Sequence, residues 1–193
     1  PDAESEQTPE IELCRVALFA LVRLQNYDGV AALTTNAQGQ PTSRWWPVAF
    51  ALQRINDARA IPALLALAST PGVDTAAFAL KGLGALKAPG VVPVAAKIAA
   101  DNAADIKLRV AAVRALGQVG GAAATAPLLD LLKSDGLSQN LAIETLNATG
   151  AAGQAVAFDP LLEWITDTVP SVRVAALAAA AKVAPDPFLT IFA

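Results

Sequence analysis

Apolar residues recur along the chain at helical spacing, and one short pattern of them returns six times. The central residue of each copy, called its anchor, falls at Leu21, Leu52, Leu80, Leu116, Leu146 and Ala180. The residues four positions before, three positions before and three positions after each anchor are nearly all apolar. These positions share one face of an α-helix, so each copy predicts an amphipathic helix. Alanine predominates four positions before the anchor, which favours close packing between neighbouring helices.

A second pattern, in which proline precedes small or branched apolar residues, runs in phase with the first. It begins at Pro62, Pro93, Pro127 and Pro160, with steps of 31, 34 and 33 residues. Proline fits the first turn of a helix, where its missing N–H would have no partner, so we predict a second helix opening at each proline. Turn-forming residues lie between the helices at 56–58, 120–121 and 150–153. Each unit is therefore predicted to be a helix–turn–helix hairpin.

Self-similarity with a period in the thirties is typical of a repeat array, in which each unit buries its apolar face against the next. No convincing alternating pattern predicts a strand, so we expect an all-α fold. The pattern predicts an acidic flexible linker over residues 1–9 and one repeat domain over residues 10–193, with about five full hairpins and a partial sixth. Such an array is a binding scaffold by default, and its pattern does not identify what is bound.

One motif within the array carries a family resemblance. Residues 105–120 read DIKLRVAAVRALGQVG, and residues 168–177 repeat the opening of this motif as TVPSVRVAAL. The motif is similar to the HEAT-like repeat first described in phycobilisome lyases. The resemblance implies a right-handed α-α superhelix, that is, a HEAT-like solenoid. Such repeats occur in lyases, in scaffolds and in domains fused to enzymes, so the resemblance is specific for the fold and not for the function.

A second stretch points to a larger protein. Residues 45–55, WWPVAFALQRI, resemble HEAT segments of bacterial multidomain proteins that carry a cyclophilin-type isomerase. This resemblance implies a bacterial protein, in the cytoplasm or the periplasm, with further domains in its full-length chain. The chain begins at Pro1 and contains no Met, which we interpret as a piece of a longer polypeptide.

The residue types that carry catalytic chemistry are scarce. The chain has no His and a single Cys, Cys14, so it has no Ser–His pair, no imidazole or thiolate metal site and no internal disulfide. We therefore expect no catalytic residue, no metal and no cofactor, and we interpret the chain as a non-catalytic protein–protein interaction scaffold, not an enzyme. The alternatives are an accessory segment of a larger bacterial enzyme, such as a cyclophilin-type peptidyl-prolyl isomerase or a chromophore lyase, and a purely structural spacer. Cys14 is expected to be a small buried hydrophobe, with lipid or bilin attachment as its alternative role.

Negative charge is concentrated at the start of the chain. The net charge is −3, and five of the 17 acidic residues are Asp2, Glu4, Glu6, Glu10 and Glu12. The basic residues are scattered, whereas a nucleic-acid-binding protein would carry a basic stripe, so we expect no nucleic acid. No apolar run reaches the roughly 18 residues that a membrane span needs. The expected partner is a protein or peptide, and self-association stays open.

An outward-facing column of aromatic residues is the first candidate partner site. Two positions before the anchor, the six copies carry Phe19, Phe50, Phe78, Arg114, Glu144 and Ala178. At 100° per residue this position lies nearly opposite the buried stripe. We predict that the three phenylalanines contribute to a contact beyond the core, with the N-terminal linker, a second copy or a partner. The alternative is that the rings tuck sideways against neighbouring first helices or under the linker.

The second candidate partner site lies along the second helices, which line the concave face of curved helical arrays. Polar side chains gather there toward the C-terminus at Asp130, Lys133 and Glu163. Trp164 follows Glu163 and is either a buried edge or an aromatic anchor for a peptide.

Two arginines occupy the column of Cys14, on the core side of the first helix. A charge in such a place needs a partner, and an aspartate precedes each arginine near the expected helix start. We therefore predict a structural pairing role for Arg109 and Arg173 with Asp105 and Asp167. Contact with a ligand is the alternative.

Overall fold

Residues 9–192 are described by the computed structural model, and this part of the chain folds into helices joined by turns. It contains twelve α-helices and no β-strand, and its pairing of extended backbone is one isolated bridge between Thr35 and Pro41. The predicted all-α fold class is confirmed. Residues 1–8 of the predicted linker lie outside the described residues, and Pro9 already begins the first helix. The chain divides into two compact units, Pro1–Gly90 and Val91–Ala193.

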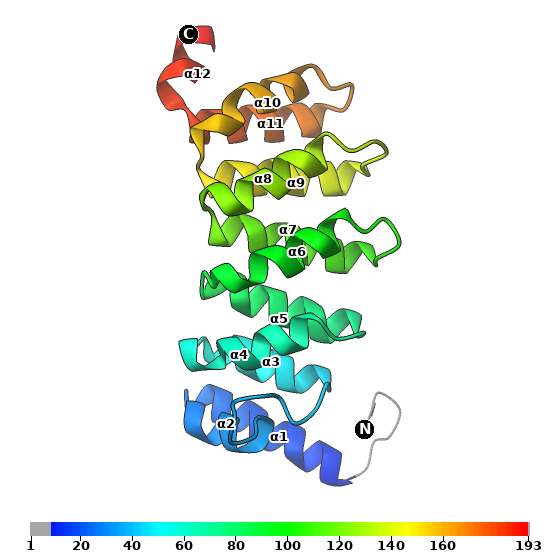
Figure 1. Cartoon of the computed structure of the whole chain (residues 1–193), viewed down its shortest axis with the longest axis vertical. Coiled ribbons are helices and arrows are strands. Elements are labelled where there is room, and N and C mark those ends of the chain that lie inside the picture. The colour runs from blue at the N-terminus through cyan, green and yellow to red at the C-terminus, as the bar shows by residue number, and fades with distance from the viewer. Residues whose placement is uncertain (1–8, 193) are drawn as a thin grey trace. The chain divides into compact units, whose positions relative to one another are not determined.

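The first unit is built on three helices in a row. Its elements are α1 (Pro9–Arg23), α2 (Tyr27–Thr34), α3 (Trp46–Ile55), the short 3-10 helix η1 (Ala58–Ala60), α4 (Ile61–Ala68) and α5 (Val73–Ala85). α3 packs between α1 and α5, while α2 contacts α1 and α3, and α4 contacts α3 and α5 (Figure 1). The first helices of successive repeats therefore form one layer of this unit, and the second helices form another.

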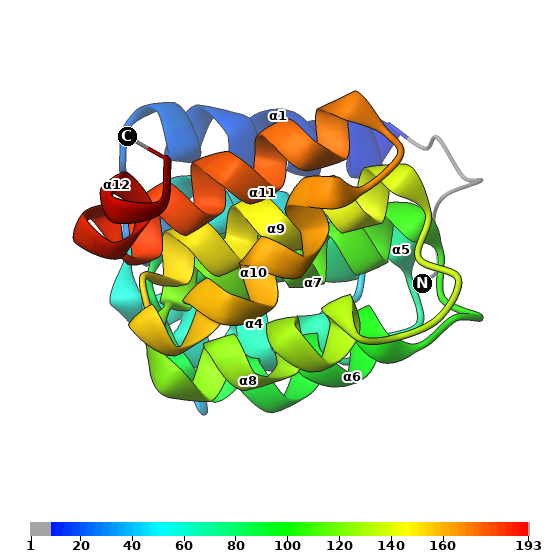
Figure 2. The ribbon, with the colours of Figure 1, turned by 90° about the horizontal axis from the view of Figure 1, so that it is seen from above.

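The second unit repeats this layering. Its elements are α6 (Val92–Ala100), α7 (Ile106–Val119), α8 (Gly121–Leu132), α9 (Gln139–Ala152), η3 (Ala155–Ala157), α10 (Phe158–Leu162), η4 (Glu163–Thr166), α11 (Pro170–Val183) and α12 (Pro185–Phe192). Another short 3-10 helix, η2 (Pro89–Val91), precedes α6. α9 packs between α7 and α11, with α8 against α9 and α10 against α11 (Figure 2).

The predicted anchors all lie in the first helices of the repeats, which are α1, α3, α5, α7, α9 and α11. Leu52, Leu80, Leu116 and Leu146 are each 0% exposed, whereas Leu21 in α1 is half-buried. Burying one such leucine contributes about 1.5–3 kcal/mol, so this column forms the main apolar core of both units.

Two details of the predicted hairpins are wrong. Pro127 does not open a helix but lies inside α8, which begins at Gly121. The Gly120–Gly121 pair turns the chain with φ angles of 69° and 75°, so the second helix can start there. The N–H that Pro127 lacks would have bonded the carbonyl of exposed Ala123, which water can reach. The turn expected at 150–153 is limited to Gly153, because residues 150–152 belong to α9.

Gly150 and Gly117 set the spacing between first helices in the second unit. A Cβ on Gly150 would lie 2.8 Å from the Cα of Ala179 in α11. A Cβ on Gly117 would lie 2.8 Å from the Cα of Ala148 in α9. Since both contacts would be with backbone, the close approach of α7, α9 and α11 depends on these glycines.

Candidate protein-binding surface

Four aromatic side chains form a continuous row across the first helices of the first unit. The ring of Phe50 in α3 lies 5.3 Å from that of Phe19 in α1 and 5.4 Å from that of Phe78 in α5, centroid to centroid, in edge-to-face geometry. Trp46, one turn before Phe50, lies 6.3 Å from Phe50 and stacks on Phe78 at 6.0 Å. All four side chains are half-buried. We call these four residues the aromatic row.

The rings thus pack sideways on one another, which is the alternative that the sequence left open. Each edge-to-face pair contributes about 0.5–1.5 kcal/mol beyond the area it buries. The same column also joins neighbouring first helices in the second unit. There Arg114 in α7 donates to Glu144 in α9, with a distance of 2.9 Å from Nε to Oε2. This hydrogen bond raises the pKa of Arg114 above its usual range. The column therefore links neighbouring first helices through aromatic contacts in one unit and an ion pair in the other.

Three basic side chains follow the aromatic row at a distance of one helical turn. Arg23 follows Phe19 by four positions, Arg54 follows Phe50 by four, and Lys81 follows Phe78 by three, all on the same helices. All three residues are exposed, and within residues 9–192 none of them forms an ion pair. We call Arg23, Arg54 and Lys81 the cation row. The sequence analysis missed it, although the helical spacing from each phenylalanine was visible there.

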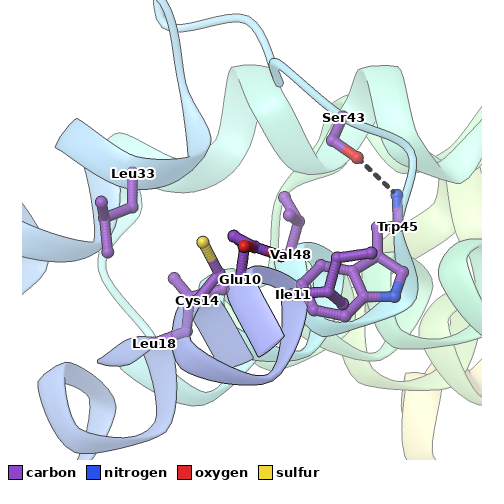
Figure 3. Close-up of a pocket in the computed structure, with 8 residues that line it drawn as sticks. All are labelled: Glu10, Ile11, Cys14, Leu18, Leu33, Ser43, Trp45 and Val48. Atoms are coloured by element: carbon purple, nitrogen blue, oxygen red, sulfur yellow. Dashed lines mark hydrogen bonds between the residues drawn. The ribbon is translucent and has the colours of Figure 1, made fainter. Parts of the chain in front are cut away.

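An apolar hollow of about 260 Å³ opens beside α1 (Figure 3). Its walls are Glu10, Ile11, Cys14, Leu18, Leu33, Ser43, Trp45 and Val48. The backbone N–H of Trp45 donates to Ser43 Oγ at 3.1 Å, which fixes the segment that leads into α3. Cys14 is a free, exposed thiol on this wall, so the expectation that it is a buried hydrophobe is wrong. The same column is half-buried or exposed in the other repeats as well, at Trp45, Val73, Arg109, Gln139 and Arg173, so it lies at the edge of the core.

α1 also exposes a stripe of large apolar side chains. Leu13 is 70% exposed, Val16 is 60% exposed, and Leu24, directly after the helix, is 74% exposed. The positions equivalent to Val16, Ala20 and Leu24 are buried in α3, α9 and α11, where they hold Pro47, Ala51 and Ile55, Leu141, Thr145 and Thr149, and Ala175, Ala179 and Val183. Ala179 in this column meets the preceding helix at Gly150. The stripe on α1 therefore corresponds to the face of α11 that packs against α9, the first helix of the preceding repeat.

Comparison with protein families identifies the repeats. A family model described as HEAT repeats matches residues 71–147, and one described as PBS lyase HEAT-like repeat matches residues 48–70. The chain is a HEAT-like repeat protein. The two matches adjoin each other and support the all-α HEAT-like repeat solenoid as its fold class. A search of curated proteins found no match to the chain.

The recurring arginines of the HEAT motif bond backbone carbonyls and not the expected carboxylates. Arg109 Nε donates to the backbone carbonyl of Ala99 at 3.0 Å, and Arg173 donates to the carbonyls of Asp167 and Thr168 at 2.9 and 3.2 Å. Their positions are half-buried and not part of the core. The two carboxylates instead bond backbone amides, Asp105 that of Lys107 at 2.7 Å and Asp167 that of Val169 at 2.7 Å. The arginines therefore tie each first helix to the segment before it. Asp105 caps the start of α7, whereas Asp167 bonds the amide of Val169, the residue that precedes α11.

The second candidate surface of the HEAT-like repeats is polar and dispersed. Asp130 in α8, Lys133 directly after α8, and Glu163 in η4 are exposed. Trp164 is half-buried and packs against the apolar cluster around Leu161 and Val172. Within the described residues no hydrogen bond or ion pair joins these four side chains to one another, so their role in binding stays a prediction.

A polar cluster on the loops of the first unit was also missed, because its members lie far apart in the sequence. Arg59 forms ion pairs with Asp57 at 2.8 Å and Asp28 at 2.9 Å, and its guanidinium lies 4.0 Å from the ring centroid of Tyr27. The hydrogen bonds from Arg59 lower the pKa of Asp57. The cluster ties the first turn of α2 to η1, which is a structural role.

Two features of the described residues bear on metal binding and on membrane insertion. Across residues 9–192, no three His, Cys, Asp or Glu side chains are grouped as a metal site would need. The helices in the same part of the chain are all too short or too polar to cross a membrane.

Proposed function

We propose that this HEAT-like repeat chain is a non-catalytic scaffold that binds a protein or peptide through its aromatic row. HEAT repeats are protein-interaction scaffolds as a class, and that general role is shown for this chain by its family matches. The observation that carries the finer proposal is the set of four half-buried aromatic side chains in contact across three helices. Clusters of Trp, Phe and Arg are enriched at the energetic centres of protein interfaces.

The residue types in the chain favour a binding role over an enzymatic one. HEAT families are typically non-enzymatic, although one matching model takes its name from a lyase. A chain without His would have to take its acid–base groups from Asp, Glu, Lys, Tyr or Cys. An accessory place beside a catalytic domain of a larger bacterial protein is compatible with the same binding surface.

Selection from a random peptide library tests this function. We expect peptides selected on the 193-residue chain to lose at least tenfold in affinity for the variant Phe19→Leu/Phe78→Leu, which keeps apolar volume but removes two rings of the row. The matched control is Leu189→Ala in α12, where an exposed apolar residue changes outside the row and affinity should stay the same. Selected peptides that bind both variants equally, or acceleration of prolyl isomerisation by the chain, would contradict the proposal.

We further propose that the exposed stripe of α1 mediates self-association of this chain. A face with Leu13, Val16 and Leu24 at 60–74% exposure is a sizeable apolar patch, of the kind that marks an association surface. Sedimentation velocity should show reversible dimers at high micromolar concentration, and Val16→Lys/Leu24→Lys should be monomeric throughout with an unchanged helical circular dichroism spectrum. A wild-type chain that stays monomeric at these concentrations would show that the stripe has no self-complementary partner.

A further inference from the structure

The aromatic row and the cation row lie on the same helices, and this shared placement points to the chemistry of the partner. α1, α3 and α5 each present one phenylalanine and, one turn later, one unpaired base. We propose that the two rows together form a docking surface for an acidic amphipathic helix. This inference rests on the proposed function and adds the partner's charge and shape to it.

Charge complementarity supports an acidic partner. Arg23, Arg54 and Lys81 are exposed without an ion pair, so three positive charges run parallel to the rings. On the opposite side of the row, Arg15 is neutralised by Glu12 at 2.5 Å, and Asp74 in α5 is exposed. The surface is therefore positive along one edge, which steers a partner with acidic residues and fixes its orientation.

The spacing of the rings supports a helical partner. The centroids of Phe19, Phe50 and Phe78 follow one another at steps of 5.3 and 5.4 Å. An α-helix advances about 5.4 Å per turn, so apolar side chains at i, i+4 and i+7 of a bound helix match the spacing of the three phenylalanine rings. In an extended strand, side chains on the same face recur about every 6.6 Å, so they would not match the spacing of the three rings. The acidic residues of the helix then lie beside its apolar stripe, over the cation row.

The orientation of the rings disfavours nucleic acid. Proteins that bind single-stranded nucleic acid stack bases on exposed aromatic faces. Here Phe50 meets Phe19 and Phe78 edge to face, and the face of Phe78 stacks on Trp46. These contacts and the half-buried state of all four residues leave little open aromatic face on which a base could stack.

Binding of a defined probe tests the inference. The probe is an 18-residue synthetic peptide with Leu at i, i+3, i+4 and i+7 spacing and Glu at most other positions. Its controls are a peptide with the same leucines and Lys in place of Glu, and a single-stranded oligonucleotide. We expect the acidic peptide to bind the 193-residue chain with micromolar affinity that falls as salt is raised, and at least tenfold more tightly than either control.

Charge reversal in the cation row identifies the site. The variant Arg23→Glu/Arg54→Glu/Lys81→Glu should weaken binding of the acidic peptide at least tenfold, whereas Lys97→Glu/Lys107→Glu/Lys182→Glu in the second unit should leave its affinity within twofold. All six wild-type residues are exposed, so both variants should fold, which circular dichroism checks. Equal binding of acidic and basic peptides, stronger binding of the oligonucleotide, or no effect of the first variant would overturn the inference. If library peptides bind the aromatic row but are not acidic, the proposed function stands and this inference fails.

Discussion

Replacing Gly150 with alanine is expected to lower the free energy of unfolding by about 2 kcal/mol, within the range of overpacked cores. The physical reason is the Cβ position, which lies 2.8 Å from the Cα and 3.0 Å from the Cβ of Ala179. Backbone atoms cannot rotate away, so α9 and α11 must separate and loosen the leucines between them. Helix propensity acts in the opposite direction and favours alanine by about 1 kcal/mol, so the sign of the result is informative.

Urea unfolding of the 193-residue chain measures this change. The matched control is Asn147→Ala, an exposed position on the same helix, where we expect a shift within about 0.5 kcal/mol. If Gly150→Ala is as stable as the wild type or more stable, the close packing between first helices described here is wrong.

Replacing Phe50 with alanine is expected to cost about 2–3 kcal/mol, below the 3–5 kcal/mol of a fully buried phenylalanine because the ring is half-buried. Phe50 contacts Phe19, Phe78 and Trp46, so its removal breaks the row in the middle. The equivalent residue in the second unit is Arg114, whose side chain is 61% exposed. Replacing it with alanine should lower the free energy of unfolding by about 0.5 kcal/mol.

A double-mutant cycle separates ring pairing from simple loss of apolar area. The coupling between Phe19→Ala and Phe50→Ala should be about 0.5–1.5 kcal/mol, the range of measured aromatic pairs. Additive effects of the two substitutions would mean that the rings are neighbours without a stabilising contact.

Helical periodicity predicted the first helices well, because every repeat samples the same burial pattern. The leucines at 52, 80, 116 and 146 are buried as their spacing required. The same angular reasoning placed Phe50 away from the second helices, which agrees with its contacts to α1 and α5. It could not show that the rings touch, because sideways contact depends on how far apart neighbouring repeats stand.

Three errors in the prediction have physical explanations. Gly150 was assigned to a turn because glycine is frequent there, whereas its missing side chain serves a contact with a helix 29 residues further along the chain, at Ala179. Pro127 was assigned to a helix start because the interior of a helix disfavours it. Cys14 was assigned to the core through its column, but the positions of that column are half-buried or exposed in every repeat. Gly150 serves a tertiary contact that local spacing does not encode, whereas Pro127 lies inside α8 because the Gly120–Gly121 turn lets that helix start earlier.

The most direct test of the binding surface is to follow the indole N–H signals of the three tryptophans, Trp45, Trp46 and Trp164, by nuclear magnetic resonance during titration with the acidic amphipathic peptide. Trp46 belongs to the aromatic row, while Trp164 packs against the core of the second unit. We expect the Trp46 signal to shift in proportion to bound peptide and the Trp164 signal to stay in place. A shift of Trp164 with Trp46 unchanged would place binding on the second unit and contradict the account.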